Sequence, residues 1–319
     1  SVGKGNNADV IIICNIDQGT GEIKLVSVFR DTYLSVSDNG LYNKINQAYF
    51  LGGPEQAVEA LNRNLDLQID DFATFNWKAV VDAVNILGGV DVELSKAEFY
   101  YINAYITETV EATGVGSYQL KQAGLNHLDG VQAVAYARLR KMDTDFARTE
   151  RQREIIDLCF QKLKKSGFAV VNNVMEAVFP QILSSVTIDD IIPAARNLTK
   201  YTIADTMGFP AARSDANMGK KGACVIPQTL ESNVIELHRF LFGEEDYQPS
   251  DMVKNISKKI SADSGLYKEG KPIESVGTDG GYIPKPTEPS RSTEPSTSKE
   301  EEDESGSSTS GTDESVLDY

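Results

Sequence analysis

The sequence predicts an α/β protein, because segments of two kinds alternate along the chain. Short runs rich in Ile and Val, such as "ADVIIICNID" and "EIKLVSVFR", are typical of β-strands. Longer runs such as "GGPEQAVEALNRNL" repeat their apolar residues every three or four positions, as amphipathic helices do. Alternating strands and helices indicate layered α/β folds. With 319 residues, 40 % of them hydrophobic, the chain can bury one large core or two modest ones.

The first two strands are separated by the turn residues of "DQGTG". Both are apolar on successive residues, which is expected of strands covered on both faces. Cys14, in the first strand, is therefore expected to be a small buried apolar residue. Pro54 is expected in the first turn of the helix that follows, and "FATFN" can form another strand.

The next segments continue the alternation. "WKAVVDAVNILGG" predicts a second amphipathic helix closed by Gly88 or Gly89, and "VDVEL" a strand beyond it. The polar stretch Ser95–Gln119 has no pattern that assigns its structure. "LDGVQAVAYAR" and "ARTERQREIIDLCFQKLKK" both predict helices, and residues 166–243 show further helical patterns. We expect residues 1–245 to form one domain.

Residues 246–319 are predicted to be a linker followed by a disordered, acidic, Ser/Thr-rich tail, with order fading from Glu244. Between Thr287 and Tyr319 there are ten acidic and two basic residues, a net −8 out of a formal charge of −16. So few apolar residues cannot offset the entropy cost of ordering. The remainder of the chain is also acidic, so no broad nucleic-acid-binding face is expected.

No apolar run approaches the ~20 residues of a membrane span. The sequence begins with Ser1 and not with methionine, so we expect it to be a processed piece of a longer protein. Cys14, Cys159 and Cys224 show no metal-binding spacing, and their odd number argues against a disulfide framework, although one bridge stays open.

The segment "YARLRKMDTDFARTERQ", residues 136–152, concentrates arginine in this acidic chain. Arg138 and Arg140 share a face only in extended backbone, and the preceding helix is expected to end near Ala137 or Arg138. Asp145 is the expected N-cap of the next helix. Both guanidinium groups are then free to point the same way.

On that next helix Arg148, Arg151 and Gln152 stand at positions i, i+3 and i+4, and we expect them on one face near its N-terminus. Helix N-termini favour anions, and the guanidinium fork matches phosphate oxygens in pairs. The segment therefore predicts a phosphate or diphosphate site. The alternative is a solvated charged face paired with the neighbouring acids Asp143, Asp145 and Glu150.

Arg30 and Asp31 stand where the second strand ends, the place where α/β folds put their sites. The alternative is an ordinary ion pair at a strand end. Lys44 and Asn46, in "YNKINQAY", can add donors for an anion or be plain loop residues.

Four segments in this order resemble the LytR–CpsA–Psr family of cell-wall phosphotransferases, and they cover Asp9 to about Ile156. They are "ADVIIICNID", "KLVSVFRDTYLSV" with "YNKINQAYFLGG", "VVDAVNILGGVDVEL" and "HLDGVQAVAYARLRKMDTDFARTERQREII". The resemblance implies an α/β/α layered fold with a mixed central sheet and an apolar lipid tunnel between sheet and helices. It also implies an enzyme on the extracytoplasmic face of a Gram-positive cell membrane, held by an N-terminal anchor that this sequence lacks.

Members of such a family move a glycopolymer from a polyprenyl diphosphate carrier onto peptidoglycan and form a phosphodiester. The resemblance places the family's diphosphate-binding residues at Arg30, Arg138, Arg140 and Arg148, with Gln152 beside them, and one Mg²⁺-binding acid at Asp9. Two departures stand out. Asn7 and Ala8 replace the usual Arg-Ser before Asp9, and no acid precedes Asp9 to supply the second metal ligand.

The implied reaction is attack of a wall sugar hydroxyl on the sugar-linked phosphorus, with polyprenyl phosphate as the leaving group. Arg30 is then a catalytic residue, and Asp31 either orients or deprotonates the hydroxyl or fixes Arg30. His127, at a turn, and His238 are expected to be structural. Two other functions stay open, a polyprenyl-diphosphate diphosphatase and a non-catalytic binding module for lipid-linked diphosphates. A transcriptional regulator is poorly supported, because no helix-turn-helix pattern is present. The glycopolymer, teichoic acid or capsule or another, is not specified by the sequence.

Overall fold

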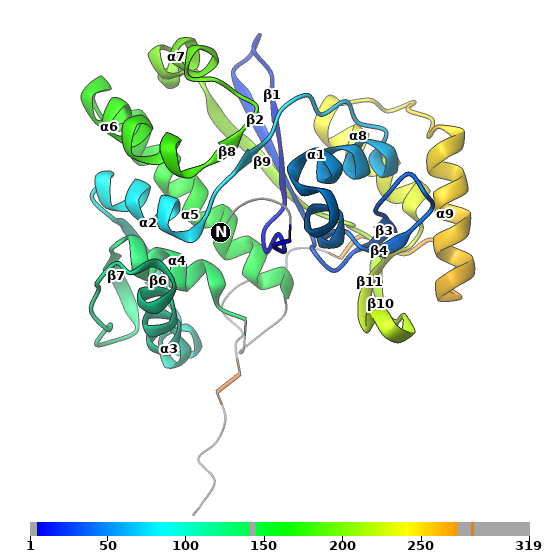
Figure 1. Cartoon of the computed structure of the whole chain (residues 1–319), viewed down its shortest axis with the longest axis horizontal. Helices are drawn as coiled ribbons and strands as arrows, with labels where there is room; N and C mark the ends of the chain where they lie inside the picture. The colour runs from blue at the N-terminus through cyan, green and yellow to red at the C-terminus, as the bar shows by residue number, and fades with distance from the viewer. Residues whose placement is uncertain (1–4, 141–144, 274–281, 284–319) are drawn as a thin grey trace, which may run out of the picture. The chain divides into compact units, whose positions relative to one another are not determined.

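The computed structural model describes residues 5–140, 145–273 and 282–283 (Figure 1). A mixed three-stranded sheet lies at its centre, with the strands in the order β1 (Ile12–Ile16), β2 (Glu22–Val28) and β9 (Thr202–Phe209). Strand β2 pairs antiparallel with β1, with Val26 opposite Ile13, and parallel with β9, with Val26 opposite Met207. The predicted α/β class with a mixed sheet is confirmed.

The two predicted strands differ in burial. The middle strand β2 is covered on both faces along its second half. The edge strand β1 alternates between covered and open positions, and Cys14 is exposed. The prediction of a buried Cys14 is therefore wrong, because an edge strand with one partner leaves part of its surface to solvent.

One apolar core lies between the sheet, the hairpin of β3 (Tyr33–Ser35) and β4 (Tyr42–Lys44), and three helices, which are α1 (Asn46–Leu65), α8 (Leu230–Phe242) and α9 (Asp251–Ser264). Helix α1 starts before the expected first turn at Pro54. It is kinked at Gly53, whose φ of 78° is open to glycine, so Pro54 begins a new helical stretch after the kink.

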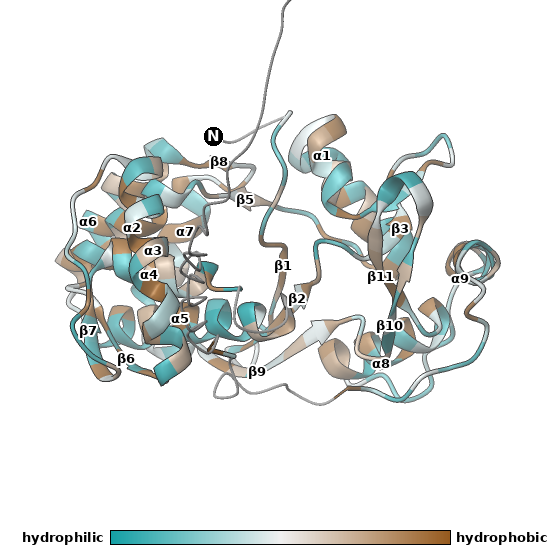
Figure 2. Cartoon of the chain, turned by 90° about the horizontal axis from the view of Figure 1, so that it is seen from below, coloured by the Kyte–Doolittle hydropathy of each residue, from teal (hydrophilic) through white to brown (hydrophobic). Residues whose placement is uncertain are grey.

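A second core joins four helices and a hairpin. The hairpin is β6 (Val90–Leu94) with β7 (Gly124–Leu128), and the helices are α2 (Trp77–Ile86), α3 (Lys96–Thr113), α4 (Gly130–Arg138) and α5 (Asp145–Lys165). Hydrophobic stretches of α4, brown in Figure 2, contribute to this core. Helix α3 fills the stretch that the sequence left unassigned. It begins with a capping box between Ser95 and Glu98, and it buries Ile102 and Ile106 on one face.

The helical patterns expected within residues 166–243 are confirmed, but they describe only part of this stretch. Helices α6 (Phe168–Val178) and α7 (Ile188–Arg196) are present. The stretch also holds four strands, which are β9, the pair β10 (Arg213–Asn217) and β11 (Ala223–Pro227), and β8 (Leu183–Ser184), which pairs with β5 (Ala73–Thr74). Strand β9 reads "TIADTMGF", and its polar residues hide the strand pattern.

Order does not fade at Glu244, contrary to expectation, and the compact unit extends to Ile283. Helix α9 buries Val253, Ile256 and Ile260 against the first core, at a spacing that the sequence reading overlooked. The Asp66 carboxylate accepts hydrogen bonds from the Tyr247 hydroxyl at 2.6 Å and from Ser250. The predicted tail, residues 284–319, lies outside the described residues.

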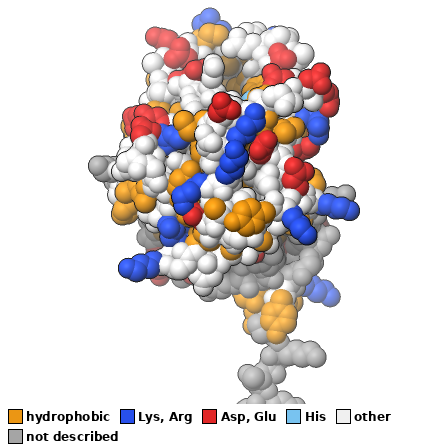
Figure 3. All heavy atoms as spheres, turned by 90° about the vertical axis from the view of Figure 1, so that its right-hand side faces the viewer, with side chains coloured by type: hydrophobic (Ala, Val, Ile, Leu, Met, Phe, Trp, Pro, Cys, Tyr) orange, Lys and Arg blue, Asp and Glu red, His pale blue; other side chains and the backbone are white. Residues whose placement is uncertain are grey.

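Figure 3 draws one side of the molecule with its side chains coloured by type. Basic and acidic side chains of the described residues are intermixed there.

The two histidines have structural surroundings. His238 is buried, with Nε2 2.9 Å from the Leu65 carbonyl. His127 lies in β7 and not in a turn, and its Nδ1 is 2.6 Å from Asp91 on the neighbouring strand.

Candidate functional site

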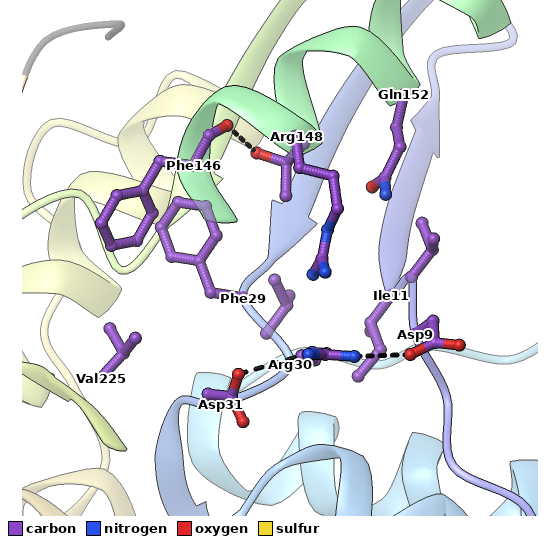
Figure 4. Close-up of a pocket in the computed structure, with 12 residues that line it drawn as sticks. Asp9, Ile11, Phe29, Arg30, Asp31, Phe146, Arg148, Gln152 and Val225 are labelled. Carbon is purple, nitrogen blue, oxygen red and sulfur yellow. Dashed lines mark hydrogen bonds and ion pairs between the residues drawn. The ribbon is translucent and has the colours of Figure 1, made fainter. Parts of the chain in front are cut away.

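A small cavity opens where the central sheet meets the start of α5 (Figure 4). It has an empty volume of about 340 Å³, including space open to solvent. Three parts of the chain far apart in sequence supply most of its wall: residues 9–11 before β1, residues 28–31 at the end of β2, and residues from the first two turns of α5. The residues in the wall are Asp9, Val10, Ile11, Val28, Phe29, Arg30, Asp31, Phe146, Arg148, Thr149, Gln152 and Val225.

Backbone hydrogen bonds hold the sheet side of this wall. The Val28 N–H donates to the Ile11 carbonyl, and the Phe29 N–H donates to the Phe209 carbonyl. After Phe29 the chain turns, since the Thr32 N–H donates back to the Phe29 carbonyl. The turn places Arg30 and Asp31 at the end of the strand, as the sequence predicts.

Arg30 lies between two carboxylates. Its Nη1 is 2.5 Å from Asp9 Oδ1, and its Nε is 3.4 Å from Asp31 Oδ2. Lys44 Nζ is 2.9 Å from the other oxygen of Asp31. Asp31 therefore has a cation on each oxygen, whereas Asp9 pairs with Arg30 alone among the described residues and has a side chain that is 48 % exposed.

Arg148 and Gln152 face the same cavity from α5. Arg148 is 5 % exposed and extends from the helix toward Arg30 (Figure 4). Gln152, one turn later, donates from Nε2 to the Ala137 carbonyl at 3.2 Å. Its Oε1 is buried and has no hydrogen-bond partner in the described part of the chain. Two guanidinium groups and an amide thus converge on one small space, which suits an anion.

The rest of the wall is apolar or aromatic except for Thr149. The rings of Phe29 and Phe146 meet edge to face with centroids 4.6 Å apart. Arg213, on β10, stacks over the Phe146 ring at 3.8 Å and over Phe29 at 4.9 Å. Burial lowers the pKa of the Arg213 guanidinium from its ordinary value. Sequence reasoning missed Arg213, because no motif marks it and only the tertiary fold brings β10 against the cavity residues Phe29 and Phe146.

Arg138 and Arg140 do not line the cavity. Arg138 ends α4, as predicted, but its Nη1 donates to the Thr109 hydroxyl of α3 at 2.7 Å, and its Nη2 is 3.5 Å from Glu108. The guanidinium carbon is 5.6 Å from the centre of the Trp77 ring. Arg140 is exposed. Their part in binding an anion stays a prediction.

Arg151 is the clearest departure from the expected arrangement. It is fully buried, its Nε donates to Glu98 Oε1 at 2.8 Å, and its Nη1 donates to the Leu139 carbonyl at 3.1 Å. Arg148 and Gln152 are one full turn apart, but Arg151 is rotated away from both of them around the helix. The buried carboxylate of Glu98 holds Arg151 on the side of α5 that faces α3, so the three side chains do not share one face.

Lys44 and Asn46 act beside the cavity and not in its wall. Lys44 binds Asp31, as described above, and Asn46 is the first residue of α1. The Asn46 N–H donates to the Arg30 carbonyl at 3.2 Å. Both residues thus hold the Arg30–Asp31 turn. Of the acids named for the alternative charged face, Glu150 is 3.9 Å from Arg153, whereas Asp143 and the side chain of Asp145 lie outside the described residues.

Asp9 fits a divalent cation as a single carboxylate ligand. It lies at the cavity, and its Oδ2 has no bonded partner among the described residues, while Oδ1 binds Arg30. Mg²⁺ commonly takes one or two protein carboxylates and completes its shell with water and substrate phosphates. Among the described residues no group of three or more His, Cys, Asp or Glu side chains is arranged to hold a metal.

The described part of the chain also contains no helix that is long and apolar enough to span a membrane.

Sequence comparison identifies the class. The model of the LytR_cpsA_psr family matches residues 2–219, and the chain belongs to this family. It is 30 % identical over 192 residues to an uncharacterised protein of Staphylococcus aureus, covering 60 % of this chain and 45 % of that protein. It is 25 % identical over 252 residues to the polyisoprenyl-teichoic acid–peptidoglycan teichoic acid transferase TagV of Bacillus subtilis, covering 77 % of this chain and 62 % of TagV. The chain thus spans about half of the length of the curated relatives that it matches.

Solved structures support the fold. The crystal structure of B. subtilis TagV superposes with a TM-score of 0.60 at 24 % identity, covering 76 % of this chain and 91 % of that one. The structure of TagT bound to LIIa-WTA gives a TM-score of 0.55 at 21 % identity, covering 82 % of this chain and 86 % of that one. At this level of identity the likeness establishes the fold of the family.

Proposed function

We propose that this chain is the extracytoplasmic part of a phosphotransferase that moves a glycopolymer from a polyprenyl diphosphate carrier onto peptidoglycan. One observation carries the proposal. Arg30, Arg148 and Gln152 converge on a cavity whose remaining wall is largely apolar and aromatic. A diphosphate joined to a hydrocarbon chain combines an anion with an apolar body, and such a wall complements both. Curated relatives named as teichoic acid transferases give the same reaction class.

A second observation supports a lipid-linked substrate. Helix α6 reads "FAVVNNVMEAV", yet only Val171 and Val178 are buried, and α7 has no buried residue. Phe168 is 58 % exposed and Ile188 is 44 % exposed. Apolar side chains left open in this way favour an apolar ligand. We propose that the carrier's hydrocarbon chain lies against this helical side of the molecule.

In the proposed reaction a hydroxyl oxygen of the acceptor sugar attacks the phosphorus that is bonded to the glycopolymer. The bond from this phosphorus to the bridging oxygen breaks, polyprenyl phosphate leaves with the electron pair, and the hydroxyl proton passes to the departing phosphate. Arg30 and Arg148 neutralise the charge that builds on the phosphate oxygens, and the fold holds them in place before the substrate arrives. Mg²⁺, with Asp9 as its protein ligand, supplies further charge neutralisation when it is bound.

We assign Asp31 to positioning of Arg30, because both of its oxygens already have a cation. Oδ2 is 3.4 Å from Arg30 Nε, and Oδ1 is 2.9 Å from Lys44 Nζ. A base that takes the hydroxyl proton would have to release one of these contacts. Asp31→Asn keeps an oxygen toward one partner, so a positioning role predicts partial loss of transfer with an unchanged pH profile. A general base predicts near-complete loss.

The experiment that tests the function supplies a labelled polyprenyl diphosphate glycan and oligomeric peptidoglycan. Label on the peptidoglycan together with released polyprenyl phosphate supports the transferase. Water-dependent phosphate release without label on the wall fraction would make the protein a diphosphatase instead. Binding with neither product would make it a lipid-diphosphate binding module.

A further inference from the structure

A buried ion pair contacts the backbone just after the end of α4, between Arg138 and Arg140. Arg151 is fully buried and Glu98 is 2 % exposed, and they meet at 2.8 Å. The other end of the Arg151 guanidinium donates to the carbonyl of Leu139 at 3.1 Å. Leu139 stands between Arg138 and Arg140, and it is itself fully buried. The ion pair therefore holds the backbone at the one residue that separates these arginines.

Glu98 is itself held firmly by α3. Its Oε2 accepts the Ser95 N–H at 2.8 Å, while its own N–H donates to the Ser95 hydroxyl at 3.2 Å. One carboxylate oxygen thus caps α3 and the other binds Arg151, so the position of the guanidinium is set by a helix terminus. Rotation of the Glu98 carboxylate would break one of these two hydrogen bonds.

The same short stretch is held at two more points. Gln152 donates to the Ala137 carbonyl at 3.2 Å. Arg151 and Gln152, adjacent on α5, thus donate hydrogen bonds to two carbonyls of residues 137–139. From the other side, Thr109 of α3 accepts a hydrogen bond from Arg138 at 2.7 Å. Helices α3 and α5 thus fix the end of α4 between them.

This arrangement offers more for positioning than for stability. Taking two charges out of water costs free energy that their attraction often fails to recover, so apolar residues of similar volume are commonly as stable in the same place. An apolar pair cannot, however, donate to the Leu139 carbonyl. Resting on the proposed function, we propose that Arg151 and Glu98 are positioning residues: without contacting the lipid-linked diphosphate, they hold the backbone at Leu139, between Arg138 and Arg140, the two arginines predicted to bind it.

The first test uses Arg151→Lys, with Arg153→Lys as the matched control on the same helix. A lysine ammonium keeps the charge beside Glu98 but lacks the fork that also reaches Leu139. Arg153 pairs with Glu150 at 3.9 Å and donates to the Thr149 hydroxyl at 3.5 Å, both on its own helix. Affinity for a short-chain polyprenyl diphosphate should fall about tenfold in Arg151→Lys and stay unchanged in Arg153→Lys.

A double-mutant cycle separates positioning from general stability. On an Arg138→Ala/Arg140→Ala background, Arg151→Lys should cost no further affinity, because the groups that it positions are gone. An equal loss on both backgrounds would overturn the proposal. The paired change Glu98→Leu with Arg151→Met should restore the denaturation midpoint lost in Arg151→Met alone, but not the affinity. Recovery of both would also overturn it.

Amide hydrogen exchange tests the positioning independently of the function. The Leu139 N–H is bonded to the Tyr136 carbonyl, and its protection should fall at least tenfold in Arg151→Lys with the rest of α4 unchanged. Unchanged protection would refute the positioning role even if the diphosphate binds. Failure of the wild-type protein to bind a polyprenyl diphosphate, with the exchange result as expected, would refute only the proposed function.

Discussion

Replacing Arg30 by alanine is the most direct test of the cavity as a diphosphate site. Arg30 contacts a carboxylate on each side, Asp9 and Asp31, and its side chain is 19 % exposed. Arg30→Ala removes the guanidinium and leaves Asp9 and Asp31 in place. The two consequences, for folding and for binding, are expected to differ strongly in size.

The stability cost should be small. The partners Asp9 and Asp31 are 48 % and 22 % exposed, and ion pairs this close to solvent contribute about 0–1 kcal/mol. Asp31 keeps Lys44 at 2.9 Å, so no buried charge is left alone. A loss of about 1 kcal/mol corresponds to a fall in melting temperature of roughly 2–4 °C for a domain of this size.

The binding cost should be large. A charge-assisted hydrogen bond to phosphate contributes about 1.5–3 kcal/mol, so its loss weakens binding roughly tenfold to hundredfold. In the protein without ligand the guanidinium only neutralises two carboxylates, and its full value appears when an anion arrives. Arg30→Lys should recover part of this affinity, because the charge remains while the planar fork is lost.

Calorimetric titration with a short-chain polyprenyl diphosphate, beside a thermal melt, measures both quantities. Arg63→Ala is the matched control, since Arg63 is 16 % exposed and pairs with Asp38 away from the cavity. It should keep wild-type affinity. A melting temperature that drops well beyond a few degrees in Arg30→Ala, with affinity unchanged, would show that the cluster is structural and refute the cavity as the diphosphate site.

Four further predictions follow from the same geometry. Arg138→Ala should lower the free energy of unfolding by about 1–2 kcal/mol in urea titrations, because it loses Thr109 and the stacking on Trp77; no loss would place its side chain elsewhere in solution. Asp9→Asn should raise the Mg²⁺ concentration that gives half-maximal transfer, because a neutral amide oxygen is a weaker ligand; an unchanged Mg²⁺ curve would remove Asp9 from the metal site. Burial raises the pKa of the Glu154 carboxyl above its ordinary value of 4.5, so the folded state favours the protonated acid. The contribution of Glu154 to the free energy of unfolding therefore falls as pH rises from 4.5 through the raised pKa. Glu154→Gln should therefore exceed wild type in unfolding free energy at about pH 7 and lose this advantage at about pH 4; a constant difference would contradict the assignment. A chain ending at Ile283 should melt with the full chain, because residues 284–319 offer few apolar side chains to bury; a clearly lower melting temperature would argue against it.

Local patterns in the sequence determined a large part of the fold. Apolar runs predicted β1 and β2, and the helical period predicted α2, α4 and α5. These patterns work because a strand or helix exposes its period within a few residues of chain. The same local logic identified the end of β2 with Arg30 and the first turns of α5 with Arg148 and Gln152, which the structure brings to one cavity.

Elements that depend on distant partners could not be predicted in this way. Strand β9 joins β2 as a parallel neighbour from the far part of the chain, and its polar residues gave no strand signal. The sequence of helix α9 predicts a linker, because its charged residues outnumber the few apolar ones that it buries. Both elements are stabilised by residues far away in the sequence: β9 by its pairing with β2, and α9 by its packing on the first core.

The role of each arginine was decided only by the tertiary structure. Arg148 and Arg151 are three residues apart and indistinguishable by spacing, yet one faces the cavity and the other is fully buried. The difference comes from Glu98, 53 positions away along the chain, whose carboxylate stands behind α5. Arg213 likewise reaches Phe146 only because β10 folds back onto the site. A sequence determines which side chains can bind an anion, whereas the placement of distant counter-charges decides which way each of them points, since a guanidinium held by a buried carboxylate is turned away from the cavity.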